Sequence, residues 1–335
     1  MELSTDDRPS ADRHVNVLIT AAGRRTSLVK AFATEVHRRG GRVYAGDVDA
    51  LAPALYFADD VVRTLRTDDP AYIRNLLDAV TRHGIGLVIP TIDGDLPVLS
   101  AAKEAFLERG CQVAVSDPAF VATTLDKQRT GAAFGAAGIH VPWSWLPPIR
   151  YLGDLPPMVF VKPRRGSASQ DLYTVPRERL ESILDLLTDP VVQEVLTGPE
   201  ITIDALLDLK GTPIHYVPRL RIRTLGGESV QGVTLEHDEA TEAWITRLLR
   251  ICSRMGAVGP LTIQAFIGRD DLVLSEINPR FGGGFPLALA AGATYPAWLL
   301  DMVEGRPIAA RLGEYEAGLY MTRYNVEHFT RHPKW

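Results

Sequence analysis

Glu276, Asn278 and Arg280 occupy alternate positions in the segment VLSEINPRFGGG, residues 273–284. Alternate residues of a strand share one face, so these polar side chains point the same way, which is costly unless they have partners. The preceding apolar segment LTIQAFIG carries Gln264, and a hairpin through GRDD brings it beside Glu276. Such oxygen ligands suit magnesium, and an arginine suits an anionic oxygen. The pattern therefore predicts a site for a magnesium-bound nucleotide.

A phosphate-binding element is expected upstream, in VFVKPRRGSASQDL. Lys162 ends a predicted strand there, and a turn of Gly166, Ser167, Ala168 and Ser169 follows. The backbone N–H groups of such a turn can surround phosphate oxygens. The order of glycine and lysine differs from a Walker A loop, so the segment predicts a phosphate contact of another kind.

Charged residues on three further predicted strands could complete a nucleotide site. Glu194 and Glu200 in VVQEVLTGPEITID could accept hydrogen bonds from an adenine amino group or from ribose hydroxyls. Arg219, Arg221 and Arg223 alternate in RLRIR, just before the glycine-rich turn LGGES. Either this is a solvated edge strand, or at least one of these arginines contacts phosphate or substrate.

The elements that would position these residues change in character along the chain. Strand-like and helix-like segments alternate over residues 15–117, which predicts a parallel sheet covered by helices. After a proline-rich linker, 142–157, most segments read as strands, with helices over PRERLESILDLL and EATEAWITRLLRICSRMG. This half is expected to be an antiparallel sheet with few helices, so the fold class is α/β and α+β multidomain.

The first strand and helix could suggest a dinucleotide site, with Asp47 as the ribose-binding acid. Only Gly23 is present where three glycines are needed, and Arg24 and Arg25 stand where the backbone should approach a pyrophosphate. We therefore expect a scaffold at this position, whose arginines attract an anionic substrate. Asp93, at the end of a later strand, is a further candidate for substrate contact.

In order along the chain, TLDKQRT, VFVKPRRGSAS, QEVLTGPE, RLRIR, Gln264 and EINPRFGGG resemble the ATP-grasp superfamily, most of all the type of the carbamoyl phosphate synthetase large subunit. The resemblance covers nearly the whole chain. It implies an N-terminal Rossmann-like (pre-ATP-grasp) domain, a central lid and a C-terminal antiparallel-sheet domain. We expect a disordered tail over 1–14, the Rossmann-like domain over 15–118, the lid with its linker over 119–190 and the catalytic domain over 191–335.

The same resemblance implies a role for each matching residue. Lys127 and Lys162 would contact ATP phosphates together with the Gly166–Ser169 turn, and Glu200 would hold the ribose. The adenine hinge would be Gln193, Glu194, Val195 and Leu196, with Arg221 as a further nucleotide contact. Gln264, Glu276 and Asn278 would bind two magnesium ions, for which manganese could substitute, while Arg280, Lys162 and Asn278 would act in catalysis.

ATP-grasp enzymes typically phosphorylate a carboxylate, and an amine or thiol then attacks the acyl phosphate. A complete carbamoyl phosphate synthetase carries this unit twice, and FGGG replaces the second arginine that follows its NPR. The sequence therefore favours a stand-alone carboxylate–amine ligase, in which these glycines leave room for a larger substrate. We expect that substrate to be an amino acid or a small carboxylate. The alternatives are a carbamoyl phosphate-type or kinase-like reaction, and a non-catalytic nucleotide-binding regulatory module.

Composition sets aside several other classes. The net charge of −5 and the scattered basic residues give no footprint for nucleic acid. No long apolar run suggests a membrane segment, and the two distant cysteines predict neither a disulfide framework nor a zinc site. The histidines show no HExxH spacing, and no GxSxG elbow occurs. We expect a cytoplasmic protein that takes small-molecule substrates and can form a homodimer.

Overall fold

The structure, a computed structural model, describes residues 14–166, 171–269 and 271–335. Most of the tail expected over 1–14, and the turn residues Ser167 and Ser169, therefore lie outside the described residues. None of the helices formed by the described residues combines the length and the apolar character that crossing a bilayer requires.

The N-terminal domain is the expected parallel sheet, in the order β3-β2-β1-β4-β5. Its strands are β1 (Asn16–Thr20), β2 (Val43–Asp47), β3 (Asp60–Arg63), β4 (Ile85–Pro90) and β5 (Gln112–Val113). Its helices are α1 (Thr26–His37), α2 (Tyr72–His83), α3 (Asp95–Ala101) and α4 (Lys103–Leu107). The sheet forms because β1, β2 and β4 are almost wholly buried apolar runs, which need helices on both faces. The short strand β3, more exposed, was not predicted.

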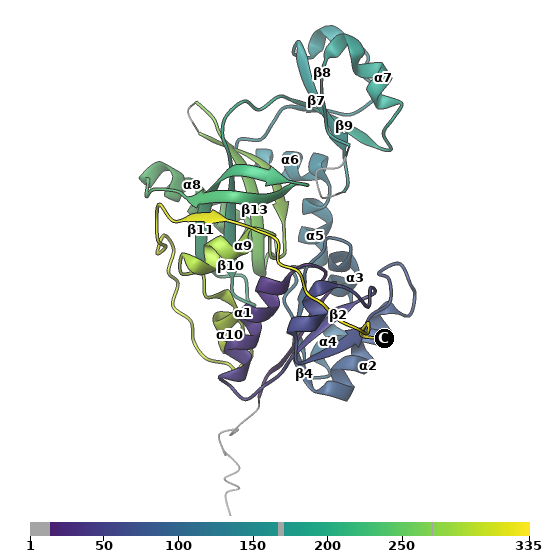
Figure 1. Cartoon of the computed structure of the whole chain (residues 1–335). Coiled ribbons are helices and arrows are strands. Elements are labelled where there is room, and N and C mark those ends of the chain that lie inside the picture. The colour runs from purple at the N-terminus through teal and green to yellow at the C-terminus, as the bar shows by residue number, and fades with distance from the viewer. Residues whose placement is uncertain (1–13, 167–170, 270) are drawn as a thin grey trace, which may run out of the picture.

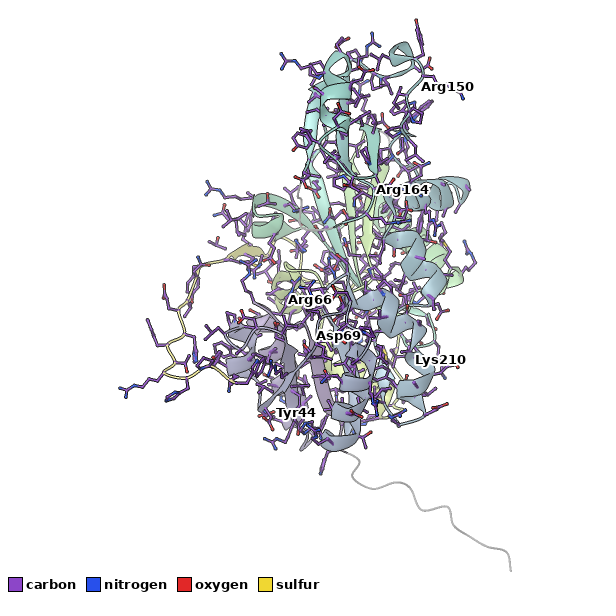
Figure 2. All side chains as sticks on the ribbon, turned by 90° about the vertical axis from the view of Figure 1, so that its right-hand side faces the viewer. Tyr44, Arg66, Asp69, Arg150, Arg164 and Lys210 are labelled. Carbon is purple, nitrogen blue, oxygen red and sulfur yellow. The ribbon has the colours of Figure 1, made fainter. Side chains whose placement is uncertain are left out.

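The second sheet, the lid, projects from the body at the top of Figure 1. Its strands are β6 (Ser144–Trp145), β7 (Met158–Pro163), β8 (Tyr173–Pro176) and β9 (Pro190–Glu194), in the order β6-β9-β7-β8. One short helix, α7 (Leu180–Leu184), covers the sheet, and five buried side chains form its core: Leu155, Val159, Val161, Leu180 and Val192. Figure 2 shows Arg150 at the outer end of the lid and Arg164 at its base.

Strand pairing corrects the boundary expected at residue 190. Strand β9 pairs with β7 and with β6, so it belongs to the lid sheet and not to the C-terminal domain. The helices α5 (Pro118–Thr124) and α6 (Lys127–Ala136), expected within the lid unit, pack on β14 of the C-terminal sheet. Phe120 and Phe134 fix them there, because both side chains are buried in the main core.

The C-terminal sheet has six strands in the order β14-β13-β10-β11-β12-β15. They are β10 (Glu200–Leu207), β11 (Pro213–Leu225), β12 (Glu228–Thr234), β13 (Gly259–Ile267), β14 (Leu272–Asn278) and β15 (Tyr320–Thr322). Helix α8 (Glu239–Arg254) was predicted, whereas α9 (Phe285–Ala290) and α10 (Tyr295–Val303) were not. The alternative that the three arginines lie on a solvated edge strand is wrong, because their strand, β11, lies between β10 and β12.

The N-terminal and C-terminal sheets share one hydrophobic core. Phe32 of α1 packs edge-on against Phe281, with ring centroids 6.0 Å apart. Nearby, Arg39 binds Asp301 and Glu304 of the α10 region at 2.8 and 2.6 Å. After β15 the chain returns across the N-terminal domain, as the yellow trace in Figure 1 shows. There the His328 ring packs at a tilt against the Tyr56 ring, with centroids 4.7 Å apart. The two sheets therefore form one body, from which the lid projects.

Candidate active site

The β13–β14 hairpin brings the predicted magnesium ligands together. In the antiparallel register Gln264 lies opposite Glu276, and Thr262 lies opposite Asn278. The Gln264 and Glu276 side chains are half-buried and Asn278 is buried, so these oxygens face a confined space. In the part of the chain that the structure describes, no group of three or more histidines, cysteines and acids could hold a metal. The predicted set combines one carboxylate with two amides. Three such ligands suit a magnesium ion whose other ligands are the phosphate oxygens of a nucleotide.

Arg280 follows this hairpin and binds Asp93 of the N-terminal domain. Its Nε and Nη2 donate to the two Asp93 carboxylate oxygens at 2.7 and 2.9 Å, a bidentate pair. Nη2 also donates to Asn278 Oδ1 at 3.2 Å, and Nη1 donates to the Phe281 carbonyl at 3.2 Å. The guanidinium is thus fixed beside the metal candidates. Among the described residues, one of its five N–H groups has no acceptor.

Lys162 faces this hairpin from the lid. Its side chain, on β7, is 5% exposed, and its Nζ lies 5.2 Å from the Phe160 ring centroid. Burial lowers the pKa of Lys162 to about 8, and the Lys127 charge also lowers it, while Glu276 and Glu200 raise it. Two lysines and two carboxylates from four separate elements therefore converge. No hydrogen bond or ion pair of the Lys162 ammonium occurs within the described residues, so this buried cation is suited to an anionic ligand.

Lys127, the first residue of α6, reaches the loop after β7. Its Nζ donates to the Gly166 carbonyl at 2.9 Å, and its backbone N–H donates to the Arg164 carbonyl at 3.1 Å. Gly166 has a φ of 127°, which favours glycine. The cradle expected after Gly166 rests on Ser167 and Ser169, which lie outside the described residues. Lys127 and Gly166 therefore meet at the lid base, while their contact with ATP phosphates stays a prediction.

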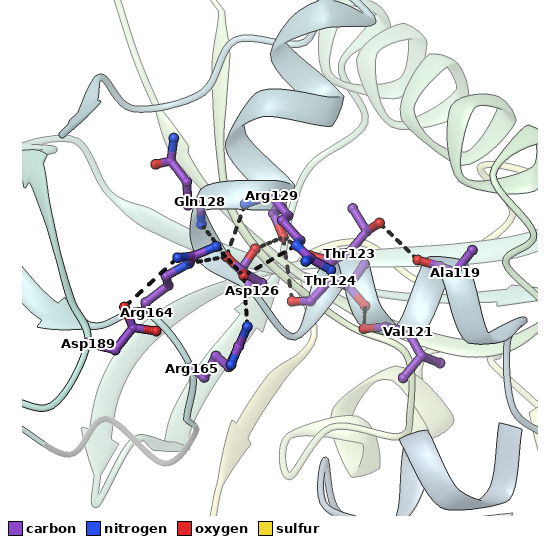
Figure 3. A network of polar contacts seen from close by, with 11 residues as sticks. Ala119, Val121, Thr123, Thr124, Asp126, Gln128, Arg129, Arg164, Arg165 and Asp189 are labelled. Atoms are coloured by element: carbon purple, nitrogen blue, oxygen red, sulfur yellow. Dashed lines mark hydrogen bonds and ion pairs between the residues drawn. The ribbon is translucent and has the colours of Figure 1, made fainter. Parts of the chain in front are cut away.

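Asp126 organises this junction, and the sequence analysis missed it. The side chain is almost fully buried and caps α6 by accepting from the N–H groups of Gln128 and Arg129, both at 3.1 Å. It also pairs with Arg164 of the lid, whose Nη2 lies 2.8 Å from Oδ2, and Arg165 Nη2 lies 3.7 Å away (Figure 3). Burial raises the pKa of Asp126, but the hydrogen bond from Arg164, the cap and the arginine charges outweigh burial and hold the pKa below its usual value.

The predicted adenine hinge connects the lid to the body. Gln193 is buried and donates to Ser144 Oγ at 2.9 Å, while Glu194 Oε1 accepts from the Trp143 N–H at 2.9 Å. One oxygen of Glu194 is therefore already used within the hinge. Val195 and Leu196, which follow, are half-buried.

The ribose candidate Glu200 begins β10 and binds Arg221 of β11 through a short ion pair. Arg221 also donates to the Gly227 carbonyl at 2.7 Å. Glu200 is near enough to Lys162 for its negative charge to raise the pKa of that lysine, against the effect of burial.

Arg219 stabilises the C-terminal sheet and does not face the candidate site. Its guanidinium is 3% exposed and binds the equally buried Asp204 carboxylate at 2.7 Å. Arg223, in contrast, is exposed. His215, also on β11, is buried and hydrogen-bonded to the Tyr295 hydroxyl and the Glu314 carbonyl, so it too has a structural role.

We expected the glycines of FGGG to leave room for a larger substrate, but the space beside each of them is taken up by side chains of the protein. A Cβ on Gly282 would lie 2.8 Å from Thr262 Oγ1, and one on Gly283 would lie 3.0 Å from an Arg25 nitrogen. A Cβ on Gly284 would collide with the Arg219 guanidinium. The glycines instead let these side chains approach the backbone closely.

Asp47, set aside above as a ribose ligand, fixes the turn after β1. Its Oδ2 accepts from the Gly23 N–H at 2.7 Å, and its Oδ1 accepts from the Val48 and Asp49 N–H groups at 2.8 and 3.0 Å. Both oxygens are therefore engaged by backbone, which fits a scaffold role.

Comparison with known proteins places this geometry in context. A family model described as the PylC-like N-terminal domain matches residues 17–114, and one described as ATP-grasp in the biosynthetic pathway with Ter operon matches residues 187–326. No curated protein sequence matches the chain.

Several solved structures share the fold at low sequence identity. The biotin carboxylase domain of Hydrogenobacter thermophilus 2-oxoglutarate carboxylase, crystallised as a dimer with MgADP, ADP and bicarbonate, has a TM-score of 0.73 at 16% identity, over 91% of this chain and 73% of that chain. N5-carboxyaminoimidazole synthetase from Staphylococcus aureus, complexed with ADP, gives 0.71 at 14% identity, over 90% and 80%. The L-amino acid ligase from Bacillus licheniformis gives 0.68 at 18% identity, over 88% and 75%.

These likenesses bear out the predicted fold: a parallel N-terminal sheet, a small central antiparallel domain and a C-terminal antiparallel sheet. The two family models match the first and the last of these parts. The chain therefore has the ATP-grasp fold, with one segment that matches the PylC-like N-terminal domain and another that matches an ATP-grasp family.

Proposed function

We propose that the protein is an ATP- and magnesium-dependent carboxylate–amine ligase that works through an acyl phosphate. The observation that carries the proposal is the buried Lys162 on the lid, which faces Glu276 across the site with Lys127 and Glu200 beside it. A buried cation opposite a carboxylate suits a phosphate chain and its divalent cation, because the phosphates satisfy the lysine and the cation satisfies the carboxylate.

Each residue then has a task that its position permits. Lys127 and Lys162 hold phosphates, while Gln264, Glu276 and Asn278 provide the oxygen ligands for magnesium. Magnesium, when bound, neutralises phosphate charge and keeps the terminal phosphoryl group in place. Gln193–Leu196 and Glu200 with Arg221 are assigned to the adenine and ribose ends of the nucleotide.

Arg280 is assigned to the transferred phosphoryl group. Its bidentate pair with Asp93 fixes the guanidinium plane beside Asn278. The remaining N–H can therefore donate to a phosphoryl oxygen without a rearrangement of the side chain. In the reaction, a substrate carboxylate oxygen attacks the γ-phosphorus and ADP leaves. An amine then attacks the acyl carbon, and inorganic phosphate leaves as the amide forms.

The likeness to the carbamoyl phosphate synthetase large subunit remains part of this proposal, as do the cytoplasmic location and the homodimer. The likeness to that subunit rests on the β13–β14 hairpin, in which Gln264 lies opposite Glu276, with Asn278 on the same strand and Arg280 just after it. Light scattering of the purified protein tests the dimer.

The test of the function is product analysis with purified protein, ATP, magnesium and pools of amino acids and other carboxylic acids, with and without hydroxylamine. We expect ADP and a hydroxamate with some acids only. Glu276→Gln should lower ADP formation about a thousandfold, because it removes the one carboxylate among the metal ligands. Glu108→Gln, an exposed acid on the N-terminal domain, is the matched control and should behave as the parent.

The other outcomes separate the alternatives. AMP and pyrophosphate would contradict the acyl phosphate route. ADP and a hydroxamate formed with an acid, but no amide with any added amine, would favour the kinase-like reaction, because a released acyl phosphate also reacts with hydroxylamine. Nucleotide binding without turnover for every pool would favour a regulatory module.

A further inference from the structure

A pocket lies next to the candidate site, between the start of α1 and the glycine loop after β14. Arg25 and Leu28 of the α1 region, Phe285 of α9, Glu228 of β12 and Arg323 after β15 line it. These residues come from the N-terminal domain and from both ends of the C-terminal domain. The folded body therefore builds the pocket, and no single motif in the sequence encodes it.

The charges around this pocket do not balance. Arg24, Arg25 and Arg323 are opposed by one acid, Glu228. Glu228 accepts from Arg323 Nη1 at 3.3 Å, and its Oε1 lies 3.9 Å from Arg24 Nη2. The Arg25 side chain forms no hydrogen bond or ion pair within residues 14–166, 171–269 and 271–335. Two positive charges therefore remain unmatched, and an anion would compensate them.

The pocket suits a small group and not a nucleotide. Its volume is about 30 Å³, enough for a head group of a few atoms. Leu28 and Phe285 are buried and form apolar walls beside the arginines. An anionic head on a short apolar chain matches this combination of walls and charge.

The pocket adjoins the reacting end of the site. Burial lowers the pKa of Arg25, and Arg280 and Arg323 lower it further, while Glu228 and Asp93 oppose them. Gly282, two residues after Arg280, lines the pocket together with Arg25, so Arg25 is close to the Asp93–Arg280 pair, where the phosphoryl group is transferred in the proposed function. A molecule whose carboxylate is activated at Arg280 can place a second group at Arg25.

We propose that this pocket binds a second anionic group, a carboxylate or a phosphate, of the acid that is activated, so that the substrate is a dianionic carboxylic acid held by Arg25 and Arg323. The assignment rests on the proposed function. Gly283 lets the loop approach these charged side chains, since a Cβ there would lie 3.0 Å from both the Arg25 guanidinium and the Glu228 carboxyl carbon.

The test measures binding and needs no turnover. Isothermal titration calorimetry with MgADP present compares glutarate with butyrate, which lacks the second carboxylate, and with 3-phosphonopropionate, which replaces one carboxylate by a phosphonate. We expect glutarate or 3-phosphonopropionate to bind at least about tenfold more tightly than butyrate, the gain of one charge-assisted contact. The stronger of the two shows which second anionic group the pocket prefers.

Two variants shift this preference in opposite directions. Arg25→Gln should reduce the preference for the dianion about tenfold, and Glu228→Gln should increase it, because the single acid is lost while the side-chain shape is kept. The opposite signs keep the test valid if one variant folds poorly. Arg66→Gln, at an exposed arginine on the N-terminal domain, is the control and should change neither affinity.

Equal affinities for glutarate, 3-phosphonopropionate and butyrate, or no binding of any of them, would overturn the assignment, whereas ADP and hydroxamate formation would still support the ligase. Tight glutarate binding that Arg25→Gln removes, with no ADP formed with any acid, would instead contradict the proposed function and with it the substrate class.

Discussion

The candidate site has a floor and a lid, and the two are held together by different forces. The floor is the six-stranded sheet, whose strands belong to a core that extends into the N-terminal domain. The lid has a core of only five buried side chains and meets the body through the polar junction around Asp126 (Figure 3). The magnesium ligands sit on the floor and Lys162 on the lid. A site divided in this way can keep the metal ligands rigid while the phosphate ligand moves with the lid.

The largest loss of stability is expected for a variant in the floor. Arg219→Gln leaves the Asp204 carboxylate buried without its cation, and we expect the free energy of unfolding to fall by about 3–5 kcal/mol. Chemical denaturation measures the change. Because the sheet and the N-terminal domain share a core, the whole transition should shift, not only a part of it.

The matched control for this floor variant is Arg66→Gln, which removes an exposed pair with Asp68 and should leave the free energy of unfolding unchanged. Joint replacement of Arg219 and Asp204 by apolar residues should recover much of the loss, since no charge is then left unpaired. A small effect of Arg219→Gln alone would contradict the view that the floor depends on this pair.

A smaller and more local effect is expected at the lid. Asp126→Ala removes the α6 cap and the partner of Arg164, which together should lower the free energy of lid opening by about 2 kcal/mol. Hydrogen exchange of residues 144–194 reports this opening. Asp117→Ala is the control, because Asp117 precedes α5 without a side-chain cap and is largely exposed. If Asp126→Ala also lowered the protection of the floor strands against hydrogen exchange, the lid and the floor would not open independently, contrary to the comparison above.

The same contrast explains which features the sequence could predict. The hairpin ligands follow from a period of two and a short turn, so Gln264 was correctly placed opposite Glu276. Asp126 could have been recognised too, because an aspartate just before a helix is a common N-cap. Local patterns were sufficient for both.

Contacts between distant segments could not be read in this way. Asp93 and Arg280 are 187 residues apart and meet only because the two sheets pack together. A strand such as β9 has the same pattern whichever sheet it joins, so its place in the lid follows from pairing alone. The glycines after β14 likewise indicate close approach without naming what approaches, here Arg25 and Arg219.

The smallest predicted effect concerns the one group that joins the regions, Lys162. Burial lowers its pKa to about 8. Between this value and the usual lysine range the unfolded chain binds more protons than the folded one, so the free energy of unfolding should rise as the pH increases above 8. Affinity for MgADP should change in the opposite direction and fall about tenfold between pH 7 and pH 9, because a neutral amine no longer attracts phosphate. Calorimetry and denaturation over this range measure the two trends, and Lys162→Met should remove both. If parent and variant gave parallel curves, Lys162 would not be the ionising group between lid and floor.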